Sequence, residues 1–142
     1  MEVTVGARLP EWRVSAVSAE KMKTTAALLA DPNPIHWDAE VVRVLGMGER
    51  PINQGPLNMA YVLNMLAAWS GGHDRLRRFR VRFRGNVFAG DELSAGGVVT
   101  GVRAEAGITL ADCDVSLDVA GGATVLSGTA TVVVGPANEE IT

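Results

Sequence analysis

The chain has 142 residues, 47% of them hydrophobic and 20% charged, with a formal net charge of -3. This length and composition predict a single globular domain, and the charge gives no support to nucleic-acid binding. The sequence shows neither a signal peptide nor an apolar run long enough to cross a membrane. Its single cysteine, Cys113, excludes an intramolecular disulfide. We therefore expect a cytoplasmic protein that binds no membrane.

The amino-terminal part of the chain predicts short elements separated by clear boundary signals. Ser18 is a good helix cap, Pro32 ends the helix that follows it, and Asp38 caps a second, short helix. Apolar residues recur at helical spacing in the first of these helices. The expected elements are extended segments around residues 3–9 and 12–17 and helices at residues 19–30 and 39–45.

The next segment predicts the central helix of the domain. Gly55 stands at its cap position and Pro56 at its first helical position, where proline is well tolerated. Within residues 57–69 only Asn58 and Asn64 are strongly polar. A helix that is apolar nearly all round is expected to be buried.

The remainder of the chain predicts a sheet that buries this helix. Long segments rich in Val, Thr, Leu and Phe are separated by glycine-containing turns. The expected strands are residues 76–87, 92–103, 108–119 and 123–134. Together these elements predict an α+β domain over residues 1–135, in which an antiparallel sheet wraps around a buried central helix. Residues 136–142 are expected to form a disordered tail.

The loop from Asp31 to Asp38 carries the main candidate for chemistry. Its two prolines restrict the backbone, so Asp31 and His36 are held on a short, stiff, non-helical turn that Asn33 can brace. A carboxylate beside an imidazole is a plausible acid/base pair. A turn of this composition more often has only a structural role. The surrounding sequence therefore has to decide whether this pair is catalytic.

The loop and the elements around it resemble those of the MaoC-like (R)-specific enoyl-CoA hydratases and dehydratases of the hotdog superfamily. Asp31, Asn33, Pro34 and His36 stand where the hydratase motif has them, and Gly55 matches a glycine at the start of the family's central helix. Two positions depart from the pattern. Ala30 replaces a common glycine, and Gln54 replaces a common histidine.

The resemblance implies a single hotdog domain that catalyses reversible addition of water to a trans-2-enoyl thioester. Asp31 would act as the base, His36 would orient the water and act as the acid, and the Gly55 N–H would hold the enolate-like oxygen. No metal or other cofactor is expected, because the thioester itself provides the activation; coenzyme A or phosphopantetheine is part of the substrate. Residues expected to contact the substrate around this centre are Asn33, Trp37, Asn53 and Gln54.

An arginine-rich strand offers a second candidate binding feature. Six of the thirteen basic residues lie between Arg75 and Arg84. Period-two alternation directs Phe79, Val81 and Phe83 toward the helix and the arginines away from it. Arg82 and Arg84 are candidates to bind the phosphates of coenzyme A or an acidic acyl carrier protein. The simpler interpretation is a solvated outer face of the strand.

Other functions of the same fold stay open at this stage. A thioesterase would direct the activated water at the thioester carbonyl, and a non-catalytic acyl-binding subunit would only retain the shape of the loop. Hotdog domains of this kind pair their sheets as dimers, so a homodimer is expected. A heterodimer with another hotdog subunit is the alternative.

Overall fold

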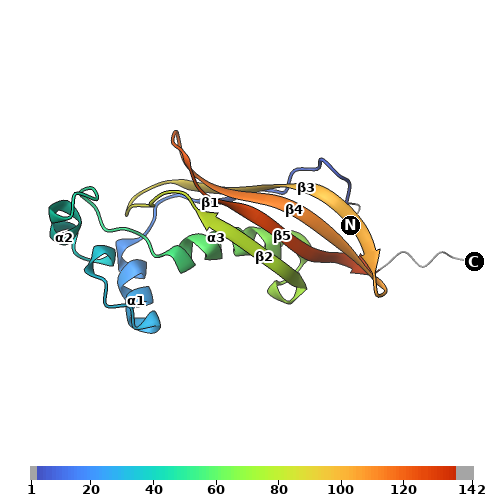
Figure 1. The fold of residues 1–142 in the computed structure, drawn as a ribbon, viewed down its shortest axis with the longest axis horizontal. Helices are drawn as coiled ribbons and strands as arrows, with labels where there is room; N and C mark the ends of the chain where they lie inside the picture. Colours follow the sequence, from blue (N-terminus) through green and yellow to red (C-terminus); the bar gives the residue numbers. More distant parts are fainter. Residues whose placement is uncertain (1–2, 137–142) are drawn as a thin grey trace, which may run out of the picture.

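The computed structural model of the chain describes residues 3–136, and it has the expected α+β architecture (Figure 1). A curved antiparallel sheet lies over the long helix α3, and the segment that holds α1 and α2 lies beyond one end of the sheet. Residues 137–142 of the predicted tail lie outside the described residues. Pro136, expected in that tail, is instead the last residue of a strand, because pairing with the neighbouring strand extends to it.

The observed helices and strands follow the expected order, with boundaries that differ by a few residues. The helices are α1 (Ala19–Leu29), α2 (Ala39–Val44) and α3 (Gly55–Ser70), with single 3-10 turns η1 (Pro34–His36) and η2 (His73–Arg75). The strands are β1 (Trp12–Val14), β2 (Leu76–Phe83), β3 (Leu93–Glu105), β4 (Ile108–Val119) and β5 (Thr124–Pro136). Gln54 is the cap of α3, so Gly55 is its first helical residue rather than its cap.

The sheet has the strand order β1-β3-β4-β5-β2, and all its neighbours are antiparallel. Strands β3, β4 and β5 follow one another along the chain, whereas β2 reaches the far edge directly after α3. The β3–β4 turn consists of Ala106 and Gly107, both with positive φ, as a two-residue hairpin turn requires. Strand β2 ends at Phe83, four residues earlier than expected, and Arg84 and Gly85 still bond to Val125.

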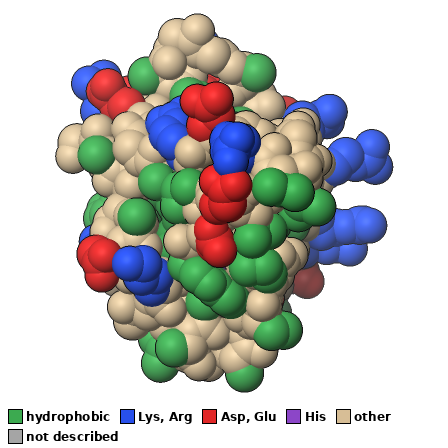
Figure 2. Space-filling model, turned by 90° about the vertical axis from the view of Figure 1, so that its left-hand side faces the viewer, with side chains coloured by type: hydrophobic (Ala, Val, Ile, Leu, Met, Phe, Trp, Pro, Cys, Tyr) green, Lys and Arg blue, Asp and Glu red, His purple; other side chains and the backbone are tan. Residues whose placement is uncertain are grey.

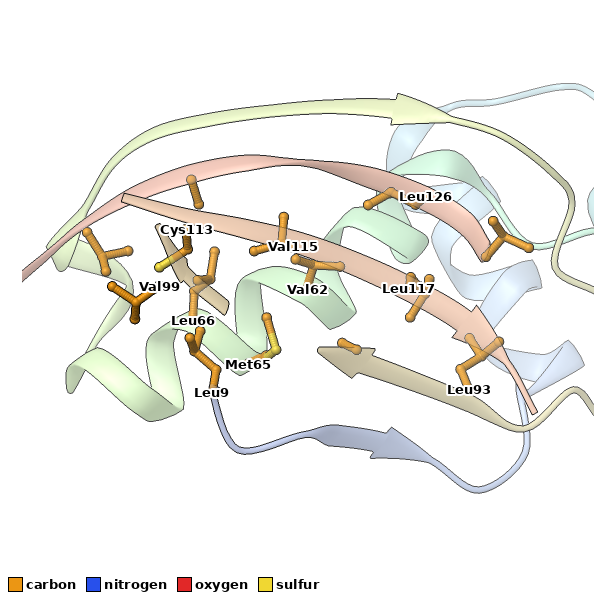
Figure 3. Close-up of a cluster of buried hydrophobic side chains, with 14 of the residues drawn as sticks. Leu9, Val62, Met65, Leu66, Leu93, Val99, Cys113, Val115, Leu117 and Leu126 are labelled. Atoms are coloured by element: carbon orange, nitrogen blue, oxygen red, sulfur yellow. The ribbon is translucent and has the colours of Figure 1, made fainter. Parts of the chain in front are cut away.

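The core lies between α3 and the concave face of the sheet (Figure 3). Val62, Met65 and Leu66 of the helix pack in one cluster with inward-facing residues of β3 and β4 such as Val99 and Leu117. The sequence predicts a helix buried all round, but only one face of α3 is fully buried in the single chain. Most of its other apolar residues are half-buried, because the sheet covers one side of the helix. No helix among residues 3–136 is long and apolar enough to span a membrane.

Cys113 lies in this core, as its position between Asp112 and Asp114 predicts. Only 1% of it is exposed. Burial raises the pKa of its thiol to about 11, and the charges of Asp112 and Asp114 act in the same direction.

Because only the thiolate is a good nucleophile, we expect Cys113 to be inert in the folded protein. Incubation with an aromatic disulfide reagent at pH 8 should release almost no chromophore from native protein. One equivalent per chain should be released in guanidinium chloride. Rapid release from native protein would contradict the burial of this thiol.

Candidate active site

The loop between α1 and α2 is held by its own side chains, as its composition predicts. Asp31 Oδ1 accepts a hydrogen bond of 3.0 Å from the backbone N–H of Asn33. Asn33 Oδ1 in turn accepts from the backbone N–H of Ile35 at 3.2 Å and caps η1. The side-chain oxygen of Asn33 is thus used inside the loop. Its expected contact with substrate stays a prediction.

Asp31 and His36 face each other across this loop. His36 Nε2 lies 3.2 Å from Asp31 Oδ2, and the side chains are 10% and 33% exposed, respectively. The carboxylate is therefore accessible from solvent, while the imidazole is largely enclosed. The structure brings together the two residues that the sequence predicts as the acid/base pair.

A backbone carbonyl fixes the protonation pattern of the imidazole. His36 Nδ1 lies 2.7 Å from the carbonyl oxygen of Ile52. Since a carbonyl can only accept, Nδ1 must carry a hydrogen. Nε2 is therefore the ring nitrogen that faces Asp31.

The same backbone segment leads into α3 and ties the loop to the helix. The Ile52 N–H donates to the carbonyl oxygen of Ile35 at 2.8 Å, and the Asn53 N–H donates to that of Val87 at 2.7 Å. Gly55 begins α3 three residues after Ile52, and no side chain caps the helix. In the first helical turn Pro56 has no N–H, and the N–H groups of Leu57 and Asn58 donate to the carbonyl oxygen of Gln54. Within the described residues, the Gly55 N–H is therefore the amide that remains available to an anionic oxygen.

Gly55 is enclosed by an aromatic ring from the sheet. A Cβ atom at this position would stand 3.1 Å from Cζ of Phe83, which is itself 51% exposed. Phe83 thus lies toward the start of α3, as the strand alternation predicts. A side chain at position 55 would require this ring to shift.

Asn53 and Gln54 are buried at the start of α3, and each uses its amide N–H groups within the protein. Asn53 Nδ2 donates to Asn58 Oδ1 at 2.8 Å and to the Tyr61 hydroxyl at 3.3 Å. Gln54 Nε2 donates to the carbonyl oxygen of Met22 at 2.7 Å. Among residues 3–136, neither Asn53 Oδ1 nor Gln54 Oε1 has a hydrogen-bond partner. Both oxygens are thus buried acceptors that the described residues leave without a donor.

Sequence reasoning missed the polar cluster that Asn53 forms with Asn58 and Tyr61. In the sequence, Asn58 is only a polar exception in an apolar helix, yet it is 3% exposed in the structure. Burial raises the pKa of the Tyr61 hydroxyl, and its hydrogen bond with Asn53 acts in the opposite direction. The available signal was the i, i+3 spacing of Asn58 and Tyr61, which places both on one face of α3 near its start. Asn53, which precedes the helix, can reach both side chains from there.

Of the remaining predicted site residues, Trp37 directly follows His36, whereas Arg82 and Arg84 lie at and just beyond the end of β2. Trp37 follows η1 and is 38% exposed. Arg82 and Arg84 line a shallow groove of about 370 Å³ with Arg80, Ser127 and Thr129, on the outer side of the sheet. The structure does not bring these arginines into the acid/base site. Their contact with substrate stays a prediction.

Comparison with known families fits this fold and loop. The MaoC-like domain model matches residues 5–120, which is most of the chain. The chain therefore belongs to the MaoC-like dehydratase family. Comparison with curated protein sequences gave no match.

Solved structures share the fold over nearly the whole chain. The (R)-hydratase from A. caviae involved in PHA biosynthesis is 27% identical over 92% of this chain and 96% of its own, with a TM-score of 0.79. R-hydratase PhaJ1 from Pseudomonas aeruginosa is 22% identical over 95% and 83%, with a TM-score of 0.76. The ChsH1-ChsH2 complex from Mycobacterium tuberculosis matches at 20% over 94% and 99%, with a TM-score of 0.78. The expected hotdog fold is confirmed.

The backbone of Ala30 gives a testable consequence of the departure from the family pattern. Ala30 ends α1 with φ of 51°, in the left-handed region. That conformation costs alanine roughly 1–2 kcal/mol, a cost that glycine avoids. The greater conformational entropy of glycine in the unfolded chain offsets about 0.4–1 kcal/mol of this gain. Ala30→Gly should raise the free energy of unfolding by roughly 0.5–1 kcal/mol in urea titrations.

Ala27→Gly provides the matched control. Ala27 is an exposed residue in the last turn of the helix, three positions earlier. The same substitution there should lower the free energy of unfolding, by at most about 1 kcal/mol. Equal losses in both variants would show that the left-handed backbone of Ala30 carries no strain.

Proposed function

We propose that this protein is an (R)-specific enoyl-CoA hydratase, or 3-hydroxyacyl thioester dehydratase, of the hydro-lyase class. The observation that carries the proposal is the pair of Asp31 Oδ2 and His36 Nε2 at 3.2 Å. The pair has a fixed tautomer and stands in a family that includes (R)-hydratases of the same fold.

Hydration at this pair returns Asp31 and His36 to their starting protonation states. The Asp31 carboxylate takes a proton from water while the water oxygen bonds to the β-carbon of the enoyl thioester. The Nε2–H of the His36 imidazolium delivers a proton to the α-carbon as the double-bond electrons move there. The proton on Asp31 then passes to Nε2 across their direct contact, which restores both groups. Dehydration runs through the same steps in reverse.

The negative charge that develops on the thioester oxygen needs donors. The Gly55 N–H at the start of α3 is the proposed donor, because amides at a helix start lack intrahelical partners and the helix dipole favours an anion there. Pro56 offers no N–H of its own. No metal or additional cofactor enters the proposal.

The acyl and carrier parts of the substrate are assigned to two separate regions. The free buried acceptors Asn53 Oδ1 and Gln54 Oε1 would receive hydrogen bonds from hydroxyl groups of a polar acyl chain or from ordered water. Arg82 and Arg84 would bind phosphates of coenzyme A or of an acyl carrier protein. Trp37 and Asn33 would border the entrance beside Asp31.

Two other functions fit the same fold. A thioesterase would use the Asp31-bound water against the thioester carbonyl and release free thiol. A non-catalytic acyl-binding subunit would bind thioesters without turnover. A cytoplasmic location and a homodimer, or a heterodimer with another hotdog chain, belong to the same proposal; one structure of this fold is the ChsH1-ChsH2 complex.

Asp31→Asn is the test of the acid/base pair. An asparagine Oδ1 can still accept from the Asn33 N–H, so the fold should persist, but the amide cannot take a proton from water. Hydration of trans-2-enoyl-CoA thioesters, short to long and with a hydroxylated chain included, should lose roughly 10²–10⁴-fold in kcat/KM. Product stereochemistry and free thiol are recorded together.

Asp38→Asn in the same loop is the control, since Asp38 caps α2 and asparagine caps equally well. It should retain wild-type turnover. Free coenzyme A without hydroxy product would identify a thioesterase. Thioester binding that Asp31→Asn leaves unchanged, with no turnover in wild type, would support the non-catalytic subunit.

A further inference from the structure

The carbonyl group that holds the His36 ring lies on a segment paired with a turn far along the chain. Residues 88–91 form this turn between β2 and β3. Ile52 and Phe88 form an isolated antiparallel bridge, and the carbonyl oxygen of Pro51 accepts from an amide of the same turn at 2.9 Å. The position of the Ile52 carbonyl group therefore depends on how firmly its segment is held against the turn.

The Arg50 side chain ties this segment to the turn. Its Nη1 donates to the carbonyl oxygen of Ala89 at 2.8 Å, and its Nη2 lies 3.1 Å from Asp91 Oδ1. The guanidinium carbon lies 5.4 Å from the centre of the Phe88 ring, within the range of a cation–π contact. One planar group thus contacts three residues of the turn, and arginine suits this role because its N–H donors are held in a rigid fork.

Asp91 is oriented to receive this guanidinium group. Its side chain is 12% exposed, whereas that of Arg50 is 52% exposed. Asp91 Oδ2 accepts from the backbone N–H of Phe88 at 2.9 Å, and its backbone carbonyl oxygen accepts from the Val17 N–H at 2.9 Å. A surface ion pair stabilises a protein appreciably only when its geometry is fixed, and that condition is met here.

The chain immediately before Arg50 is exposed. Residues 43–50 all lie at the surface, and Gly46 and Gly48 within them have positive φ. Figure 2 looks onto the end of the molecule that holds α1 and α2, where acidic and basic side chains lie among apolar ones. Arg50 is where this exposed stretch becomes bonded to the 88–91 turn, two residues before the carbonyl group that His36 needs.

We infer that Arg50 is a positioning residue for the acid/base pair and that it acts through the Ile52 carbonyl group. With that oxygen held 2.7 Å from Nδ1, the neutral His36 ring keeps its hydrogen on Nδ1. Nε2 is then free to take the proton that Asp31 receives from water. The catalytic consequence rests on the proposed hydration chemistry, whereas the effect on the imidazole ring does not.

The competing tautomer defines what is expected of a chain without Arg50. A carboxylate is a stronger acceptor than a backbone carbonyl group, because the hydrogen bond to it is charge-assisted. If the Ile52 oxygen moves away, a neutral imidazole should place its hydrogen on Nε2, where the Asp31 carboxylate accepts it. Nε2 then cannot take a proton from Asp31, so the return of the pair to its starting state is slowed.

The tautomer can be measured directly, because the chain has two histidines. Nitrogen NMR spectra of the imidazole rings distinguish a ring nitrogen that carries a hydrogen from one that does not. His73 is exposed beyond the other end of α3 and serves as an internal reference. At about pH 9, where an ordinary imidazole is neutral, Nδ1 of His36 should carry the hydrogen in the wild-type protein.

Arg50→Met keeps most of the length of the side chain and removes its donors and charge. In this variant the larger share of the His36 hydrogen should move from Nδ1 to Nε2, while the His73 signals stay unchanged. The kcat for hydration of enoyl thioesters should fall by roughly tenfold, as expected for one lost hydrogen bond. KM should not change, because the proposal gives Arg50 no contact with substrate.

Two further variants separate positioning from a general effect on the fold. Arg43→Met removes another exposed arginine, whose ion pair is with Glu40 of the same helix, and it should change neither the spectrum nor kcat. Arg50→Lys keeps a cation that can reach Asp91 but lacks the planar fork. It should fall between the wild type and Arg50→Met in both measurements.

Two results would overturn the inference. One is a wild-type His36 spectrum in Arg50→Met, with circular dichroism showing that the variant is folded. The other is an equal change at His36 in Arg43→Met, which would show that any lost surface ion pair disturbs the ring. If the tautomer responds to Arg50 alone but wild type hydrates no thioester, the proposed function fails and the link from Arg50 to His36 stands.

Discussion

The hydrogen bond from His36 Nδ1 to the carbonyl oxygen of Ile52 is the interaction on which the candidate site depends. At 2.7 Å it joins the loop after α1 to the segment that leads into α3. It fixes the tautomer of the imidazole, so that Nε2 faces Asp31. The backbone bond from Ile52 to Ile35 runs beside it. The acid/base pair and the first amides of α3 are therefore held by one short stretch of chain.

Local signals predicted most of the elements, whereas long-range contacts could not be predicted from the sequence. Ser18 and Asp38 cap the helices they were expected to cap, since a capping side chain acts on amides two or three residues away. The partner of His36 lies sixteen residues along the chain and is a backbone carbonyl, which has no side-chain signature. The predicted end of β2 was wrong for a related reason, because the residue at which this strand ends depends on its pairing with β5.

The central helix and the strand that follows it are only partly covered within residues 3–136. The sequence predicts α3 as a buried helix, yet only its sheet-facing side is fully buried. Strand β2, which follows α3 through η2, pairs with a neighbour on one side only, and its outward arginines are exposed. The apolar composition of α3 therefore predicts its place under the sheet, but not which of its faces the single chain covers.

The position of Phe83 has a consequence for what position 55 can hold. Its ring lies 3.1 Å from the place where a Cβ atom on Gly55 would stand. A larger residue at the start of α3 would therefore fit only if the side chain at the end of β2 became smaller or moved aside. The two positions are expected to change together, although they are far apart in the sequence.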